Sequence, residues 1–307
     1  MVYVSPNVAR QRRTPPLNTR LLLLALKAVS AAADALPRYP VGDRISRAAG
    51  VAWYASAPAA RAAVQDNLRH VLGRQPSRVE ILRVFQNGAL NYWDTLTIPN
   101  FTAAQILDLV DLRGAEHIDR ARDAGRGAIC ATAHLGSVSL SGQILPALGY
   151  PMTGLLEPLE PPELFEFFAR HRRALGARML PAGTPALREL LLALRRNEVL
   201  GLVTDRDVSG TGPIIPFFGA PTRFPDGAAA LSVRTGAPIL VAVALRTARG
   251  RFDAFIEPLP PLQGTGDAKR DVLQLTQAVA KRLEYYVGNH PEQWTVFQRR
   301  WPQAQPG

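Results

Sequence analysis

The sequence predicts an α/β fold, in which a central, mostly parallel or mixed β-sheet is flanked by helices and preceded by a helical N-terminal region. Short apolar runs alternate with helical patterns from about residue 110 onward, which is typical of a sheet covered by helices. Before that point the sequence shows helical periodicity. With 307 residues, 47% of them hydrophobic, the chain is long enough to bury a large core.

The predicted domain organisation is simple. Residues 1–16 are expected to form a basic, proline-containing tail, and residues 17–307 a single α/β domain whose N-terminal helical part covers 17–110. The basic "RQRR" precedes the apolar "LLLLAL", an order that superficially resembles a signal peptide. However, Lys27 interrupts this run, and no stretch reaches the ~20 apolar residues of a membrane-spanning helix.

Three helices are expected in the N-terminal region, at 17–36, 56–72 and 77–96. The last carries an apolar stripe at helical spacing, which indicates packing on a core. The first fits two environments: a packed core element, or an interfacial membrane helix assisted by the preceding arginines. The sequence leaves both environments open.

The α/β part is predicted element by element. A strand end is followed by a helix near 114–124 and a Gly-rich stop. Predicted strands then occupy "GAICATAH", "YPMTGLLEP", "ARMLP", "VLGLVTD", "PILVAVALR" and "RFDAFIEP". The predicted helices cover 138–148, 161–175, 184–196, 226–235 and 267–288.

Charge and cysteine content narrow the function classes. The formal net charge is +11 and the isoelectric point is near 10.6, a balance that favours anionic partners such as lipid headgroups, nucleic acid or acidic proteins. The lone Cys130 cannot form an intramolecular disulfide, which fits a reducing compartment. Its apolar surroundings indicate a small buried residue and not a nucleophile. The sequence contains no CxxC or HExxH motif, so we predict no metal site.

Two polar clusters follow predicted buried strands. His134 ends one strand, and Asp205, Arg206 and Asp207 end another. Active sites of such sheets lie at the carboxyl ends of the strands, so these clusters are candidates for one shared site. The alternatives are a structural histidine and a salt-bridged turn. A third cluster, "EFFARHRRALGARM", could bind an anionic group through its arginines or simply be a solvated basic helix face.

Five segments in order along residues 55–302 resemble bacterial late lipid A acyltransferases and phosphatidylinositol mannoside acyltransferases, members of the glycerolipid acyltransferase-like superfamily. The segments are "AAVQDNLRHVLG", "LRGAEHIDRARDAGRGAICATAHLGSVSL", "EFFARHRRALGARMLP", "LVTDRDVSGTGPIIPFFGAPTRFPDGAAALSVRTGAPIL" and "HPEQWTVFQRRW". The last two together are the most specific.

This resemblance implies transfer of a fatty acyl group from a thioester donor, acyl-CoA or acyl carrier protein, to a hydroxyl of a glycolipid or phospholipid. It implies His134 as the general base that takes the proton of the attacking hydroxyl. N–H groups at the start of the following helix, near Ser137, would stabilise the oxyanion. No cofactor and no acyl-enzyme are required.

One position departs from the family pattern. The family places Asp or Glu five residues after the histidine, whereas this chain has Ser139 there. Serine can accept a hydrogen bond but cannot stabilise an imidazolium by charge, so another carboxylate is needed for efficient catalysis. Glu157 is the first candidate, with Asp205 or Asp207 behind it. We therefore take His134, Ser139 and Glu157 as the candidate catalytic residues.

The same resemblance assigns the substrate cleft. By their positions in the motifs, Arg172, Asp205, Arg206, Asp207 and Arg223 are candidate substrate-binding residues. Arg172 and Arg223, which lie outside the Asp-Arg-Asp turn, would suit an anionic headgroup or a phosphate of the donor.

Three function classes explain the charge and the motifs of this sequence to different extents. The first is a peripheral acyltransferase on the cytoplasmic face of the inner membrane, where basic side chains would bind anionic lipid. The second is a family relative disabled at Ser139 that binds lipid or a partner; a carboxylate near His134 would argue against it. The third, a nucleic-acid binder, explains the charge but not the ordered motifs, and the basic-aromatic interleaving of a base-stacking surface is missing. We expect no nucleic-acid partner, and the oligomeric state stays open.

Overall fold

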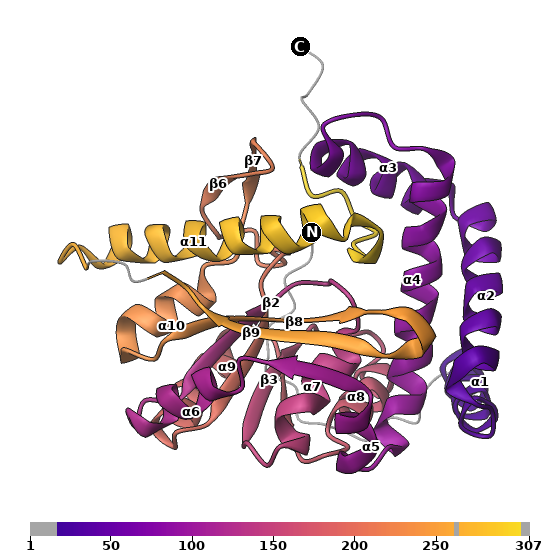
Figure 1. The fold of residues 1–307 in the computed structure, drawn as a ribbon, viewed down its shortest axis with the longest axis horizontal. Coiled ribbons are helices and arrows are strands. Elements are labelled where there is room, and N and C mark those ends of the chain that lie inside the picture. Colours follow the sequence, from indigo (N-terminus) through magenta and orange to yellow (C-terminus); the bar gives the residue numbers. More distant parts are fainter. Residues whose placement is uncertain (1–16, 261–263, 302–307) are drawn as a thin grey trace.

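The computed structural model describes residues 17–260 and 264–301, so the predicted basic tail lies outside the described residues (Figure 1). Its centre is a seven-stranded sheet in the order β1-β9-β8-β2-β5-β3-β4. Neighbouring strands from β8 to β4 pair in parallel, whereas β8 and β9 pair antiparallel. The predicted α/β fold with a mixed, mostly parallel sheet is confirmed.

The strands lie where short apolar runs predicted them. The central strands β2, β5 and β8 are buried along most of their length because helices cover both faces. The strand bounds are β1 (Val110–Arg113), β2 (Ala128–Thr132), β3 (Met152–Leu156), β4 (Arg178–Pro181), β5 (Val199–Val203), β8 (Ile239–Arg246) and β9 (Phe252–Pro258).

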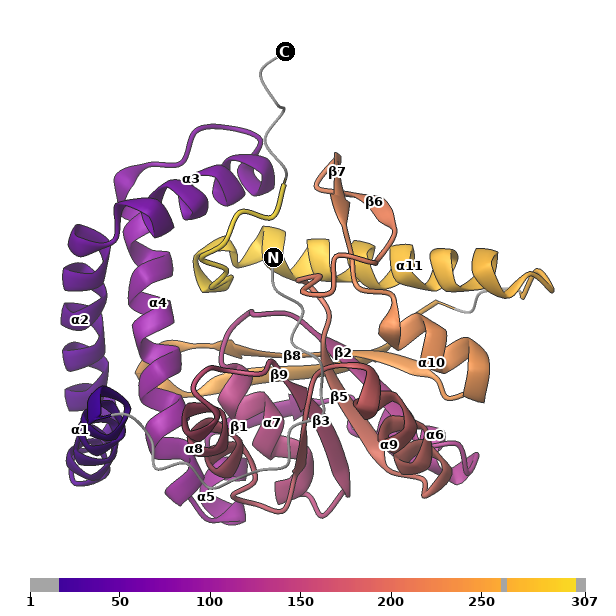
Figure 2. The same ribbon diagram turned by 180° about the vertical axis from the view of Figure 1, so that it is seen from behind.

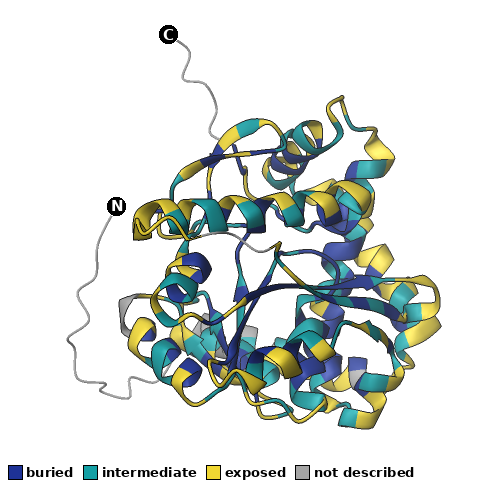
Figure 3. Ribbon diagram, turned by 60° about the vertical axis from the view of Figure 1, so that its left-hand side comes forward, coloured by how far each residue is buried: buried dark blue, intermediate teal, exposed yellow. Residues whose placement is uncertain are grey.

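Helices form a layer on each face of the sheet (Figures 1 and 2). One face packs against α5 (Ala103–Asp108), α6 (Glu116–Asp123) and α7 (Val138–Ala147). The other face packs against α9 (Thr184–Arg195), α10 (Gly227–Thr235) and α11 (Ala268–Asn289). Figure 3 shows the result, with buried strands inside and exposed outer faces on the helices.

The N-terminal helices stand at one end of this core. They are α1 (Leu17–Asp34), α2 (Asp43–Ser56), α3 (Pro58–Leu72) and α4 (Arg78–Thr97), with the segment Arg38–Gly42 between α1 and α2. In both views α4 lies between the sheet and the outer helices α1 and α2 (Figures 1 and 2). Helix α8 (Pro162–Arg172) lies on the same side as α7 and also contacts α1 and α4.

Helix α2, the short helix α5 and the β6–β7 hairpin were not predicted from the sequence. Helix α2 buries the small residues Ser46 and Gly50, because it packs closely on α4; a Cβ at Gly50 would lie 2.6 Å from Cα of Gln86. The hairpin of β6 (Ile214–Phe217) and β7 (Ala220–Arg223) contains Pro216 and Pro221, which normally argue against strands. Both prolines are tolerated because this hairpin is a separate two-stranded sheet.

The remaining helical turns are short, at Ile98–Asn100, Ala248–Gly250 and Pro291–Gln293. Within the described ranges, no helix combines the length and the apolar character needed to cross a lipid bilayer.

Candidate active site

His134 and Asp205 meet at the carboxyl ends of two adjacent parallel strands. The register pairs Thr132, the last residue of β2, with Val203, the last residue of β5. One residue separates the end of β2 from His134, and one residue separates the end of β5 from Asp205. The two polar residues therefore occupy neighbouring positions on adjacent strands. Nδ1 of His134 lies 2.8 Å from Oδ1 of Asp205. The two side chains that were candidates for one site are therefore in contact in the structure.

Asp205 is completely buried and fully hydrogen-bonded. Its Oδ2 accepts hydrogen bonds from the backbone N–H of His134, at 2.9 Å, and from the indole Nε1–H of Trp294, at 2.8 Å. Burial alone would raise the pKa of Asp205, but the neighbouring imidazole and these N–H donors lower it to about 2. Asp205 thus stays ionised at any pH at which the protein is expected to work.

The imidazole of His134 is accessible on its other side. Its side chain is 33% exposed, although its partner Asp205 has no exposed surface. Nδ1 faces the carboxylate, and Nε2 has no hydrogen-bond partner among the described residues. A carboxylate that accepts from Nδ1–H fixes the tautomer in which Nε2 is unprotonated. An imidazole held in this way can accept a proton at Nε2 from a group that reaches its open side.

Backbone contacts hold the turn between β2 and α7 in place. The carbonyl of His134 accepts from the backbone N–H of Thr295 at 2.8 Å, and the N–H of Gly136 donates to the carbonyl of Gln293 at 3.1 Å. Ser137 donates its N–H to the carbonyl of Ala244 at 3.1 Å. Two segments far from the turn in the sequence, at Ala244 and around Gln293, therefore hold the turn that carries the imidazole.

An apolar cavity opens beside this turn. It has about 780 Å³ of space, counting the part open to solvent, and lies between α7 and the sheet strands β2, β3, β5, β8 and β9. Thr132 and Val203, two residues before His134 and Asp205, line it, so the cavity reaches the end of the sheet that carries the dyad. Its walls are almost entirely apolar, with polar side chains from Thr132, Ser139, Ser141 and Arg172.

Ser139, the residue that replaces the family's acid, is bonded elsewhere. It is buried on α7, and its Oγ lies 2.6 Å from Oγ1 of Thr95 on α4. The hydrogen bond of the His134 ring goes to Asp205 instead. Ser139 also lines the cavity, so it is near the dyad without being part of it.

Glu157 is not the carboxylate that partners His134, which corrects our first choice for the substitute acid. The sheet order places β5 between β2 and β3, so the residue after β3 is one strand too far away. Glu157 pairs with Arg206 instead, with 3.1 Å between Oε2 and Nη2. Asp205, the second choice and a predicted substrate-binding residue, occupies the partner position.

Asp207 and Arg223 stabilise the loop that leads to the β6–β7 hairpin. Asp207 accepts hydrogen bonds from backbone N–H groups of Ser209, Gly210 and Gly212. Arg223 is exposed and donates to the carbonyl of Gly212 at 3.0 Å. In the structure these two side chains bind this loop and do not contact the dyad.

Arg172 differs from the other predicted arginines because it lines the cavity. Its buried Nε has no hydrogen-bond partner among the described residues. Burial lowers the pKa of the guanidinium from its ordinary value. An arginine donor left unpaired beside a cavity is suited to a polar or anionic group of a ligand.

Cys130 is buried in β2, as expected. Burial raises the pKa of its thiol to about 12, so the thiolate needed for nucleophilic attack is absent near neutral pH.

Two residues that contact this site, Trp294 and Asp94, were not among the predicted site residues. Trp294 donates to Asp205, and Asp94 of α4 accepts from the Oγ–H of Ser137 at 2.6 Å. A signal for the second was available: Asn87, Asn91, Asp94 and Thr95 repeat at helical spacing and so share one face of α4.

Comparison with known proteins extends these observations. A model of the bacterial lipid A biosynthesis acyltransferase family matches residues 19–303. A phosphatidylinositol mannoside acyltransferase of Mycobacterium tuberculosis is 34% identical over 248 residues, which cover 78% of this chain and 76% of the relative. The enzyme of that name from Mycolicibacterium smegmatis is 29% identical over 244 residues, 78% of each chain.

A more distant relative carries the other family name. The lipid A biosynthesis acyltransferase of Haemophilus influenzae is 25% identical over 183 residues, which cover 59% of this chain and 55% of the relative. The family match over nearly the whole described chain agrees with the resemblance of the motifs. This protein therefore belongs to the bacterial lipid A biosynthesis acyltransferase family and is an acyltransferase.

Proposed function

We propose that the protein transfers a fatty acyl group from a thioester donor to a hydroxyl of a glycolipid or phospholipid, with His134 as general base. The observation that carries this proposal is the contact between Nδ1 of His134 and the buried carboxylate of Asp205. The carboxylate of Asp205 supplies the negative charge that Ser139 cannot. It therefore argues against the alternative that Ser139 has disabled the enzyme and left a protein that only binds lipid or a partner.

The proposed reaction is direct transfer. The acceptor hydroxyl donates its hydrogen bond to Nε2 of His134, and its oxygen attacks the thioester carbonyl as His134 takes the proton. The ionised Asp205 stabilises the imidazolium. When the tetrahedral intermediate collapses, the C–S bond breaks, the ester remains on the acceptor, and His134 returns the proton to the departing thiolate.

The start of α7 can stabilise the oxyanion. Ser137 and Gly136 donate their N–H groups to backbone carbonyls, so they are not available for this role. Val138 and Ser139 belong to the first turn of α7 and line the cavity. N–H groups in the first turn have no acceptor within their own helix, so these two are our candidate oxyanion donors.

We assign the apolar cavity to the acyl chain of the donor. Its apolar walls and its position beside the dyad suit a hydrocarbon chain whose thioester lies near Nε2 of His134. Arg172, with its unpaired Nε, is the proposed contact for a polar or anionic group of the donor or the acceptor.

The direct test is an acyl-transfer assay with purified protein. Radiolabelled palmitoyl-CoA and palmitoyl acyl carrier protein are separate donor arms. A mannosylated phosphatidylinositol is the first acceptor, because the relatives of that name match over a larger share of the chain, and a lipid A precursor is the second. Labelled, alkali-labile lipid that depends on His134 supports the proposal. Donor binding without transfer to either acceptor, or transfer that survives His134→Ala, would contradict it.

Filling the cavity is expected to reduce activity while stabilising the fold. Gly142 of α7 lines the cavity, and a Cβ there would meet no atom within 4 Å. Gly142→Leu should raise the thermal stability, since glycine costs about 1 kcal/mol within a helix. A displaced chain loses about 0.8 kcal/mol for each methylene left unburied, so the KM for palmitoyl-CoA should rise by about tenfold or more.

Gly142→Ala is the matched control, because it adds helix propensity with little volume. It should raise the melting temperature with a much smaller effect on KM. An unchanged KM for Gly142→Leu would place the acyl chain elsewhere.

We also propose that the protein binds peripherally to an anionic membrane, on the cytoplasmic face of the inner membrane. The outer helices α1 and α2 lie at one end of the molecule (Figure 1). Within the described residues, these helices and the segment between them carry six large exposed apolar side chains. They are Leu24, Val29, Leu36, Tyr39, Ile45 and Val51. The net charge of +11 adds attraction to anionic lipid.

Leu24→Glu should weaken co-sedimentation with vesicles of mixed anionic and zwitterionic phospholipid, because it places a negative charge on the apolar surface. Ile214→Glu on the β6–β7 hairpin is the matched control, since both wild-type side chains are 61% exposed. Equal binding by the two variants would exclude α1 from the membrane-binding surface.

A further inference from the structure

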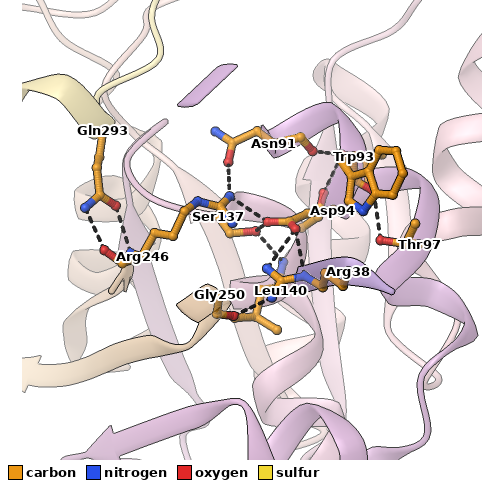
Figure 4. Close-up of polar contacts among 12 residues, drawn as sticks. Arg38, Asn91, Trp93, Asp94, Thr97, Ser137, Leu140, Arg246, Gly250 and Gln293 are labelled. Carbon is orange, nitrogen blue, oxygen red and sulfur yellow. Dashed lines mark hydrogen bonds and ion pairs between the residues drawn. The ribbon is translucent and has the colours of Figure 1, made fainter. Parts of the chain in front are cut away.

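The carboxylate of Asp94 joins three distant parts of the chain. Asp94 lies on α4 with a 1% exposed side chain. Its Oδ1 lies 2.9 Å from Nη2 of Arg38, and its Oδ2 lies 2.7 Å from Nη2 of Arg246 at the end of β8. The Oγ–H of Ser137, which begins α7, donates to the same Oδ2 (Figure 4). One carboxylate thus connects α4 to the N-terminal segment, to the end of β8 and to the turn that carries His134.

Asp94 remains charged in this environment. Burial alone would raise its pKa, but Arg246, Arg38 and the hydroxyl of Ser137 lower it overall. A buried ionised carboxylate orders its partners strongly, because each partner that loses it leaves an unpaired charge or donor.

Asp94 reaches the catalytic turn by two routes. The direct route is the bond to Ser137, whose Oγ also accepts from the N–H of Leu140 at 3.3 Å and so caps α7. The indirect route runs through Arg246. Its backbone N–H donates to Oε1 of Gln293, and its carbonyl accepts from Nε2 (Figure 4). The carbonyl of Gln293 in turn accepts from Gly136.

Neighbouring polar residues of α4 bind the same region. Asn91 donates to Oγ1 of Thr295 at 3.0 Å, and Thr295 donates its N–H to the carbonyl of His134. Thr95 bonds to Ser139 at 2.6 Å. These side chains and Asp94 lie on adjacent turns of α4, which places this face of the helix against both sides of the His134 turn.

We propose that Asp94 is a positioning residue for acyl transfer, which it serves by holding the His134–Ser137 turn through Ser137 and Arg246. This inference rests on the proposed role of His134. It makes α4, a helix of the N-terminal region, part of the apparatus that orients the base.

The two arginines of the cluster provide a matched test. Both form an ion pair with Asp94, and both guanidinium carbons lie about 5 Å from the ring centre of Phe252. Only Arg246 is connected to Gln293, whereas Arg38 binds the carbonyl of Gly250, away from the turn. Arg38→Met and Arg246→Met should therefore destabilise the fold similarly but differ in their effect on the base.

The experiment compares Arg246→Met, Ser137→Ala and Arg38→Met below the melting temperature of every variant. We expect kcat to fall by about 10- to 100-fold for the first two, since a misplacement of about 1 Å costs that much, with little change in KM for the donor. The kcat of Arg38→Met should stay within about twofold of the wild-type value. If either Arg246→Met or Ser137→Ala does not fold, the comparison of the other variant with Arg38→Met decides the test.

A second readout needs no turnover. The Nδ1–H proton of His134, bonded to Asp205, should give a downfield proton NMR signal that His134→Ala removes. Arg246→Met and Ser137→Ala should shift or broaden this signal, and Arg38→Met should leave it unchanged. Activity losses that only follow the loss of stability, with an unchanged NMR signal, would overturn the positioning role. If wild type transfers no acyl group, the proposed function fails, while the NMR signal still tests the positioning.

Discussion

Asp205→Asn is expected to lower kcat for acyl transfer by about three to four orders of magnitude, as in other enzymes where a histidine base loses its carboxylate. Two N–H donors, from the backbone of His134 and from Trp294, converge on Oδ2. The asparagine oxygen must stay there, so its NH₂ group faces Nδ1. Nδ1 then has to accept, Nε2 carries the proton, and the imidazole can no longer remove one from the substrate.

His134→Ala should show a loss of similar size in the same steady-state assay, because both changes remove the base. Glu157→Gln and Ser139→Ala are the controls: Glu157 bonds to Arg206 and Ser139 to Thr95. A loss for Glu157→Gln equal to that for Asp205→Asn would show that Glu157 supplies the carboxylate during turnover.

Gly136→Ala is expected to be the most damaging single methyl addition near the site. Gly136 has a φ of +64°, and a Cβ there would lie 1.9 Å from the carbonyl oxygen of Ala244. The backbone at Gly136 and the backbone of β8 at Ala244 must move apart. The turn that carries His134 is displaced as a result. We expect the free energy of unfolding to fall by about 3 kcal/mol or more, from backbone strain plus the clash, and acyl transfer to be lost.

Gly149→Ala is the control that separates the cost of backbone strain from the cost of the steric clash. Gly149 has a φ of +85°, but a Cβ there would meet no atom within 4 Å. This control should lose only about 1–2 kcal/mol, the cost of the left-handed backbone alone. Urea denaturation of both variants gives the comparison. Equal losses would mean that the turn relaxes around the new methyl group.

Local patterns in the sequence were sufficient for most elements of the α/β part. The buried strand "GAICATAH", for example, appears as β2 (Ala128–Thr132), followed by α7 within one residue of its predicted end. These elements were predictable because apolar period and capping are properties of neighbouring residues. Helix α2 was not, because Ser46 and Gly50 are buried only through the close approach of α4.

His134 and the carboxyl ends of two strands were also identifiable from the sequence alone, since a lone histidine and a charged Asp-Arg-Asp turn follow buried apolar runs. The partner of His134 was not identifiable. Glu157 and Asp205 both follow strands, and their sequence separations do not say which strand lies beside β2.

The tertiary structure made that choice through strand order. β5 pairs with β2, and β3 pairs on the far side of β5, so Asp205 reaches the imidazole and Glu157 does not. Asp94 and Trp294 likewise depend on contacts across 43 and 89 residues of sequence. The sequence by itself determined most elements of the α/β part and the candidate base, His134. The carboxylate that contacts His134 and the side chains that hold its turn were decided only by packing, because hydrogen bonds between distant segments exist only once the chain is folded.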